Sequence, residues 1–206
     1  MLSSVVGLLL VLCACDDSSG SIASPRLTSS SADPAAVLVQ LGDYHLGAVP
    51  DMYVTGPELV IYGDGTTFAE LYAGASEGRA QFRLATGNVP SAALQDLLAT
   101  ANTLPSATPI GEAAVDAFPL VLIVGEHRWE INDLDVQPFA SFLADLRATV
   151  DAAATEPWQP SRWIDRPYES DTCTVIDRPG DDSLYDAPVY PHLLDEYPLG
   201  ATACRP

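Results

Sequence analysis

Hydrophobic and polar residues alternate over several short segments in the middle of the chain. In residues 80–84 the apolar side chains alternate with Gln81 and Arg83, as in a strand that buries only one of its two faces. The segment 120–124 is apolar at every position, which favours a strand buried on both faces inside a sheet. The other segments with strand character are 37–41, 58–62, 66–72 and 127–132.

Two short turns separate neighbouring strands. Gly63-Asp64-Gly65 lies between 58–62 and 66–72, and Gly125-Glu126 lies between 120–124 and 127–132. Glycine adopts positive φ without steric cost, and aspartate favours turns through its side-chain oxygen. Each of the two turns therefore predicts an antiparallel hairpin.

Two further segments have the spacing of amphipathic helices. The first follows Asn88-Val89-Pro90, with Asn88 expected as its cap, and has the i, i+3, i+4, i+7 pattern at Leu94, Leu97, Leu98 and Ala101. The second begins after residues 135–138, and its apolar stripe consists of Phe139, Phe142, Leu143, Leu146 and Val150. Strands and helices together predict an α+β domain over residues 37–150. We expect a mainly antiparallel sheet with the two amphipathic helices packed on one face.

Residues 151–206 have a different composition. They hold 8 of the 17 prolines, four of the eight tyrosines and two of the three tryptophans. Proline disfavours central strands and long helices, so we expect an irregular, Pro/Tyr-rich C-terminal arm packed on the domain. The aromatic rings either cover the open face of the sheet or form an exposed recognition surface; the expected anchors are Trp158, Trp163, Tyr168 and Tyr190.

The first fifteen residues, MLSSVVGLLLVLCAC, contain a short apolar core that is too short to span a bilayer. Leu12-Cys13-Ala14-Cys15 resembles the bacterial lipobox, in which the cysteine after a small residue is acylated. The resemblance implies that residues 1–14 are a signal peptide and that Cys15 is the lipidated first residue of the mature chain. The first basic residue is Arg26, so the positively charged start of a signal peptide is missing. The alternative is a buried helix that contains both cysteines.

Residues 15–36 join the lipidation site to the domain. Residues 16–36 contain seven serines, two prolines and three aspartates but few large apolar residues. Such a composition does not bury enough surface to fold and is typical of a flexible tether. We therefore expect a protein of the cell membrane, held by its lipid on the extracytoplasmic face.

Charge narrows the range of partners. The 206 residues include 28 acids and 9 bases, all of them arginine, which gives a net charge of -19. Nucleic-acid binding needs clustered basic residues and is disfavoured, as is electrostatic docking to anionic lipid. The acidic balance favours a cationic ligand or a basic envelope protein.

Four features together resemble a group of uncharacterised secreted lipoproteins of high-GC, actinobacteria-like bacteria. The features are Leu59–Gly65, the paired strands around His127, the helix that follows Pro138, and Arg166-Pro167-Tyr168. The similarity covers about residues 37–168 and implies a lipobox followed by one α+β domain. It implies no activity, because none is established for that group.

Cysteine and histidine offer few sites for chemistry. Once the leader is removed and Cys15 is lipidated, Cys173 and Cys204 remain, and we expect them to form a disulfide in an oxidising compartment. Neither a CxxC nor an HxxxH spacing occurs, so we expect no metal site and no cofactor. The S-x-x-K motif is absent because the chain has no lysine, and the spacing G-x-S-x-G occurs once, at Gly74–Gly78, between two segments with strand character rather than between a strand and a helix. The histidines are His45, His127 and His192, and His127 is interpreted as a surface residue of a hairpin.

Two clusters of acids complete the candidate chemistry. Asp133 and Asp135 are expected to turn a strand into the second helix. The other cluster is expected to be a solvated loop, with calcium binding as the alternative; it consists of Asp177, Asp181, Asp182 and Asp186. The sequence therefore predicts a non-catalytic binding or structural module of the envelope. The alternatives are a hydrolase with a dispersed triad and a calcium-binding envelope module.

Overall fold

The computed structural model of the chain describes residues 33–42, 45–46, 54–76, 79–112, 119–165, 174–177 and 187–193. A seven-stranded sheet dominates it. The strands of this sheet are β1 (Val37–Leu41), β4 (Leu59–Tyr62), β5 (Thr66–Ser76), β6 (Arg79–Asn88), β7 (Leu120–Val124), β8 (His127–Ile131) and β9 (Glu156–Pro157). Their order is β8-β7-β1-β4-β5-β6-β9, and every neighbouring pair is antiparallel.

Both predicted hairpins are confirmed. In the β4–β5 turn the Thr66 N–H donates to the Asp64 carboxylate at 2.8 Å, and Gly65 has a φ of +87°. In the β7–β8 turn Gly125 has a φ of 56°. Glycine provides the positive φ in both turns, as the sequence indicates.

Two helices follow hairpins along the chain. They are α1 (Ser91–Ala101) and α2 (Phe139–Ala153), and each buries the stripe predicted for it. The expected cap by Asn88 is wrong: Pro90 occupies the N-cap position, and no side chain caps the helix. Asn88 instead donates through Nδ2 to the Asp64 carbonyl at 3.2 Å, because its place at the end of β6 sets it beside the β4–β5 turn. Two helices and a large antiparallel sheet make the fold α+β.

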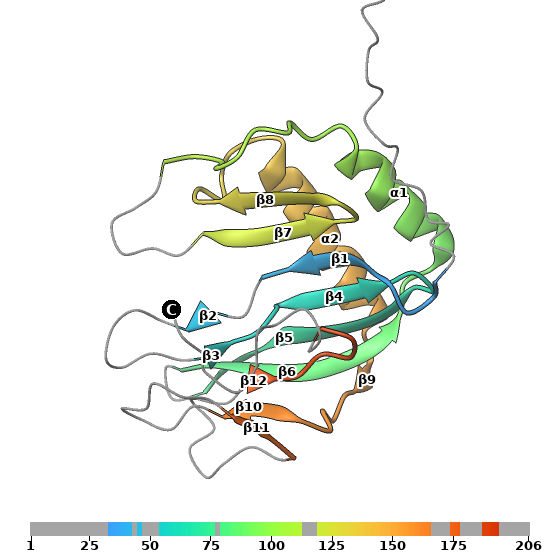
Figure 1. Cartoon of the computed structure of the whole chain (residues 1–206), viewed down its shortest axis with the longest axis vertical. Helices are drawn as coiled ribbons and strands as arrows, with labels where there is room; N and C mark the ends of the chain where they lie inside the picture. Colours follow the sequence, from blue (N-terminus) through green and yellow to red (C-terminus); the bar gives the residue numbers. More distant parts are fainter. Residues whose placement is uncertain are drawn as a thin grey trace, which may run out of the picture.

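The larger core lies between the helices and the sheet. The buried stripes of α1 and α2 pack against alternate residues of the strands, among them Val39, Leu59, Ile61, Ala69 and Ala85. Figure 1 shows α2 behind the strands of the sheet. The last turn of each helix is continued by further buried residues, Leu104 after α1 and Ala154 after α2.

The opposite face of the sheet carries a smaller core. Val60 and Tyr62 of β4 pack there with residues from the end of the chain, including Ile164, Val189 and Tyr190. The end of the chain contributes a three-stranded sheet in the order β11-β10-β12, made of β10 (Trp163–Asp165), β11 (Thr174–Ile176) and β12 (Ala187–Pro188). Together with β9, these short strands give the segment after residue 151 more regular structure than its proline content indicates. A further strand pair is β2 (His45–Leu46) with β3 (Val54–Thr55).

Candidate functional site

A small pocket lies on the face of the sheet opposite the helices, beside the β4–β5 turn. Its volume is about 260 Å³. Three distant parts of the chain line it: the residues before β1, the β4–β5 hairpin and the segment after β12. We call it the aromatic pocket; its lining residues are Pro34, Ala35, Tyr62, Asp64, Thr66, Phe68, Pro191 and His192.

Backbone hydrogen bonds fix the wall that precedes β1. The Gly63 N–H donates to the Ala36 carbonyl at 2.9 Å, and the Asp64 N–H donates to the Pro34 carbonyl at 3.2 Å. The Asp64 side chain in turn accepts the Thr66 N–H. Asp64 is exposed at the rim of the pocket, so its carboxylate is held in place while it remains accessible to a ligand.

Tyrosine hydroxyls fix the opposite wall. The Tyr62 hydroxyl donates to the Pro191 carbonyl, and the Tyr190 hydroxyl donates to the Pro57 carbonyl at 2.7 Å. His192 has a φ of 62°, which few non-glycine residues adopt. Its ring meets that of Tyr62 edge to face, with centroids 5.9 Å apart. The contacts on both sides of His192 thus hold a backbone conformation that is unfavourable by itself.

A row of aromatic rings supports the pocket from behind. Phe68 meets Tyr62 edge to face at 5.9 Å and lies 4.8 Å from Trp158, and Trp158 lies 4.9 Å from Tyr190. Aromatic pairs at these separations attract each other beyond their buried area. The lining rings therefore belong to a packed cluster and keep their positions when the pocket is empty.

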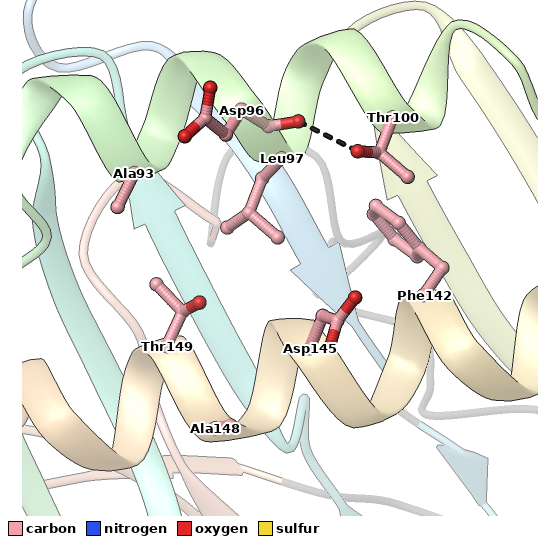
Figure 2. Close-up of a pocket in the computed structure, with 8 residues that line it drawn as sticks. All are labelled: Ala93, Asp96, Leu97, Thr100, Phe142, Asp145, Ala148 and Thr149. Carbon is pink, nitrogen blue, oxygen red and sulfur yellow. Dashed lines mark hydrogen bonds between the residues drawn. The ribbon is translucent and has the colours of Figure 1, made fainter.

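A second hollow, the helix groove, lies between α1 and α2 and has a volume of about 410 Å³. In Figure 2, Asp145, Thr149 and Phe142 project from α2 toward α1, and Leu97 lies between the two helices. Leu97 and Phe142 are buried and form its apolar floor. The complete lining is Ala93, Asp96, Leu97, Thr100, Phe142, Asp145, Ala148 and Thr149.

The helix groove carries two acidic side chains, one from each helix. Asp96 and Asp145 are both exposed. Neither carboxylate has a hydrogen bond or an ion pair with another residue of the described part of the chain. The Thr100 hydroxyl donates to the backbone carbonyl of Asp96, at 2.9 Å, and leaves the carboxylate in solvent. The groove therefore supplies negative charge, while the aromatic pocket supplies a fixed arrangement of rings and one carboxylate.

One ion pair joins the helix layer to the sheet. The Arg147 guanidinium of α2 binds both carboxylate oxygens of Glu58, at 2.6 and 2.8 Å. Hydrogen bonding to Glu58 raises the pKa of Arg147. Both side chains are about one-third exposed, so the pair contributes no more than about 1 kcal/mol to folding. Its bidentate geometry nevertheless fixes α2 against the residue that precedes β4.

Glu70 is an acid whose charged form is disfavoured in the folded protein. Burial, and then the neighbouring Glu58 carboxylate, raise the pKa of Glu70 above its ordinary value. The folded protein therefore holds this proton more tightly than the unfolded chain. At neutral pH the charged Glu70 carboxylate therefore lowers the free energy of unfolding. This loss of stability disappears as the pH falls through the folded-state pKa of Glu70 toward its lower pKa in the unfolded chain.

We expect Glu70→Gln to raise the melting temperature at pH 7. The gain should shrink as the pH falls and vanish below about pH 4, where the wild-type carboxyl is protonated in both states. Thermal unfolding of both proteins across this range measures the difference. Glu130→Gln is the matched control, since Glu130 is exposed on β8. If Glu70→Gln raises the melting temperature by the same amount at every pH, the raised pKa of Glu70 is contradicted.

The residues singled out from the sequence for covalent chemistry lie outside the described residues. They are Cys15, Cys173 and Cys204, so lipidation and the disulfide stay predictions. Of the second acidic cluster only Asp177 is described, and it is exposed. Within the described residues no three metal-ligating side chains gather. No helix in that part of the chain is both long and apolar enough to cross a membrane.

His127, His192 and the turn acid Asp133 have structural contacts. His127 is half-buried, and its ring stacks on Trp129 with centroids 5.5 Å apart. Asp133 accepts the Asp135 N–H at 2.9 Å and so forms the turn before α2. His192 is the one histidine that the structure places in the lining of a described pocket.

Most of the aromatic pocket could not be recognised from the sequence. Tyr62 and Phe68 have the pattern of ordinary strand residues, and Pro34 belongs to a segment interpreted as a tether. Asp64 was assigned only to its turn. The available signal was the apolar character of 59–62 at successive positions, which indicates that both faces of that strand are covered.

Comparisons of the chain with protein-family models, with curated proteins and with solved structures found no match. The resemblance to secreted lipoproteins therefore stays a prediction.

Proposed function

We propose that this protein is a lipid-anchored, extracytoplasmic module that binds a small organic cation in the aromatic pocket and catalyses no reaction. The leader-like residues before Cys15 and the serine-rich segment after it support the anchoring. The proposed role is to hold a binding domain near the outer surface of the cell membrane, on a tether that lets it reach its ligand.

The arrangement of the aromatic pocket supports the choice of ligand. Phe68 offers a partly exposed ring, Tyr62 is buried behind it and fixes its position edge to face, and the Asp64 carboxylate lies at the rim. A cation over an aromatic ring gains about 0.5–2 kcal/mol, the larger values applying where water is excluded. A carboxylate beside the rings favours a positive ligand over a neutral one of the same shape.

The electrostatic field of the whole chain also favours a cationic ligand. A net charge of -19 raises the local concentration of cations around the domain. This long-range attraction does not distinguish one site from another, whereas the aromatic rings do. The pocket volume of about 260 Å³ matches a compact ammonium group with short substituents, and we therefore propose a quaternary ammonium ligand.

Replacing Asp64 with asparagine should weaken choline binding about five- to tenfold, or ~1–1.4 kcal/mol. Asparagine keeps an oxygen to accept the Thr66 N–H, so the turn is preserved while the charge is lost. Calorimetric or NMR titration of the purified chain measures the affinity. The uncharged carbon isostere 3,3-dimethyl-1-butanol should bind more weakly than choline to the wild-type protein.

Asp145→Asn is the matched control, because it removes the same charge in the helix groove and leaves the aromatic pocket intact. It should change choline affinity by less than twofold. If Asp145→Asn weakens choline binding and Asp64→Asn leaves it unchanged, the cation binds in the helix groove instead. Equal binding of choline and its uncharged isostere would contradict a cation site altogether.

A further inference from the structure

The outer half of the β5–β6 hairpin extends beyond its neighbours in the sheet. β5 and β6 pair from Thr66↔Asn88 to Ser76↔Arg79. On one side, β4 accompanies β5 only as far as Ala69, with one more hydrogen bond from the Glu70 N–H to the Glu58 carbonyl. On the other side, β9 pairs only with Ala85 and Thr86. Among the described residues, the rest of the hairpin is a two-stranded ribbon.

This ribbon carries the two most exposed large apolar side chains in the described part of the chain. Tyr72 is 65% exposed and Phe82 is 56% exposed. They are cross-strand partners, and their rings meet edge to face with centroids 6.0 Å apart. A folded protein seldom leaves two adjoining aromatic rings in water without a use for them, and aromatic side chains are enriched where proteins bind each other.

The backbone of β6 is available beside these rings. The Trp158 N–H donates to the Leu84 carbonyl at 3.0 Å, which shows that Leu84 directs its backbone groups away from β5. Alternate residues of a strand direct their N–H and C=O to the same side, so Phe82 and Ala80 direct theirs to that outer edge as well. Neither has a strand partner there among the described residues. An edge of this kind is a template for an additional strand.

The charge of the ribbon differs from that of the rest of the protein. Residues 71–83 include two arginines, Arg79 and Arg83, and one acid, Glu77, whereas the whole chain has 28 acids and 9 bases. Arg83 is exposed and pairs with Leu71, so it lies on the face opposite Phe82. A segment added along β6 would therefore meet an aromatic pair on one face and a positive charge on the other.

The geometry points to a docking edge for an extended, acidic segment of a partner protein, which adds to the sheet as a strand beside β6. Its backbone bonds the outward N–H and C=O groups of Ala80 and Phe82, which have no strand partner among the described residues. Apolar side chains at alternate positions contact Phe82 and Tyr72, and acidic side chains between them lie near Arg83. Strand addition of this type obtains affinity from the main chain and selectivity from alternate side chains. The site is separate from the aromatic pocket and does not depend on it.

The test uses two blocked six-residue peptides with the full chain, one that alternates phenylalanine with glutamate and one that alternates phenylalanine with lysine. We expect the glutamate peptide to bind at least tenfold more tightly, and to slow hydrogen exchange at the Phe82 amide. Ala80→Pro removes one outward N–H and should weaken binding about tenfold or more. Arg83→Glu should reverse the preference between the two peptides. Equal binding of the peptides, or no protection at Phe82, would overturn the proposal.

Two controls make the outcome unambiguous. Asp64→Asn should leave peptide binding unchanged, which separates this edge from the cation site. If Ala80→Pro disturbs the ribbon, the effect of Arg83→Glu on the preference between the two peptides still tests the docking edge. Analytical ultracentrifugation without peptide gives the remaining alternative: a wild-type dimer that Ala80→Pro converts to a monomer would show that the edge pairs with a second copy, and would refute a heterologous partner.

Discussion

Replacing Gly87 with alanine should destabilise the protein by about 3 kcal/mol, one of the largest effects expected from a single methyl group. A Cβ at this position would lie 1.9 Å from the Ala153 carbonyl oxygen and 3.0 Å from the Ala154 Cα. These atoms belong to the backbone at the end of α2 and cannot rotate away. Either the helix end or β6 must move, and the core between them must repack.

Thermal unfolding should show this as a fall in the melting temperature of roughly 10 °C. Gly74→Ala is the control, since no atom lies within 4 Å of a Cβ there. Its φ of +117° still disfavours a side chain, so a cost of about 1 kcal/mol is expected. If Gly87→Ala is no more harmful than Gly74→Ala, the close approach of α2 to β6 is wrong.

This close approach shows which parts of the fold could be predicted from the sequence. The paired residues of the two hairpins are at most eleven positions apart, and turn glycines beside strand-like segments identify them. The stripes of α1 and α2 depend on local spacing in the same way. Gly87, in contrast, looks like a weakening residue in a strand, because nothing in the sequence indicates that the end of α2 crosses it.

The aromatic pocket could not be predicted from the sequence for a similar reason. Pro34, Asp64 and His192 are far apart in the chain. Backbone hydrogen bonds hold the Pro34 segment beside Asp64, and tyrosine hydroxyls hold the His192 segment beside β4. The expected anchors of the C-terminal arm illustrate the same limit. Tyr190 is fully buried and Trp158 packs beside Phe68, so these two rings cover the sheet. The large exposed rings of the described residues are Tyr72 and Phe82. The alternation in 80–84 predicts that Phe82 lies on a buried face, and this is wrong, because no described element covers that part of the β5–β6 hairpin.

The two faces of the sheet are therefore covered differently. One face is closed by the two helices, whose acids Asp96 and Asp145 remain in solvent and whose Arg147 pairs with Glu58. The other face is closed only in part, with the aromatic pocket beside the β4–β5 turn. The exposed aromatic pair lies toward the opposite end of β5. A cation site and a strand-docking edge at opposite ends of one long hairpin would let the domain contact two partners at once.

Replacing Cys15 with alanine should release the protein from the membrane fraction or leave it unprocessed. The proposed anchor is the acyl chains on Cys15, each of which contributes about 0.8 kcal/mol per buried methylene. A chain with a net charge of -19 gains nothing from anionic lipid, so electrostatic attraction cannot replace the acyl chains. Fractionation of expressing cells, combined with labelling by a fatty-acid analogue, measures both anchoring and acylation.

Cys13→Ala is the matched control for this experiment. Cys13 precedes the expected cleavage point by two residues, so its loss should leave acylation and membrane retention unchanged. Cys13 follows the bulky Leu12, which disfavours cleavage directly before it, whereas Cys15 follows Ala14. Labelling that survives in Cys15→Ala but disappears in Cys13→Ala would move the anchor to Cys13. Membrane retention of an unlabelled Cys15→Ala protein with its leader removed would show that another part of the chain binds the membrane.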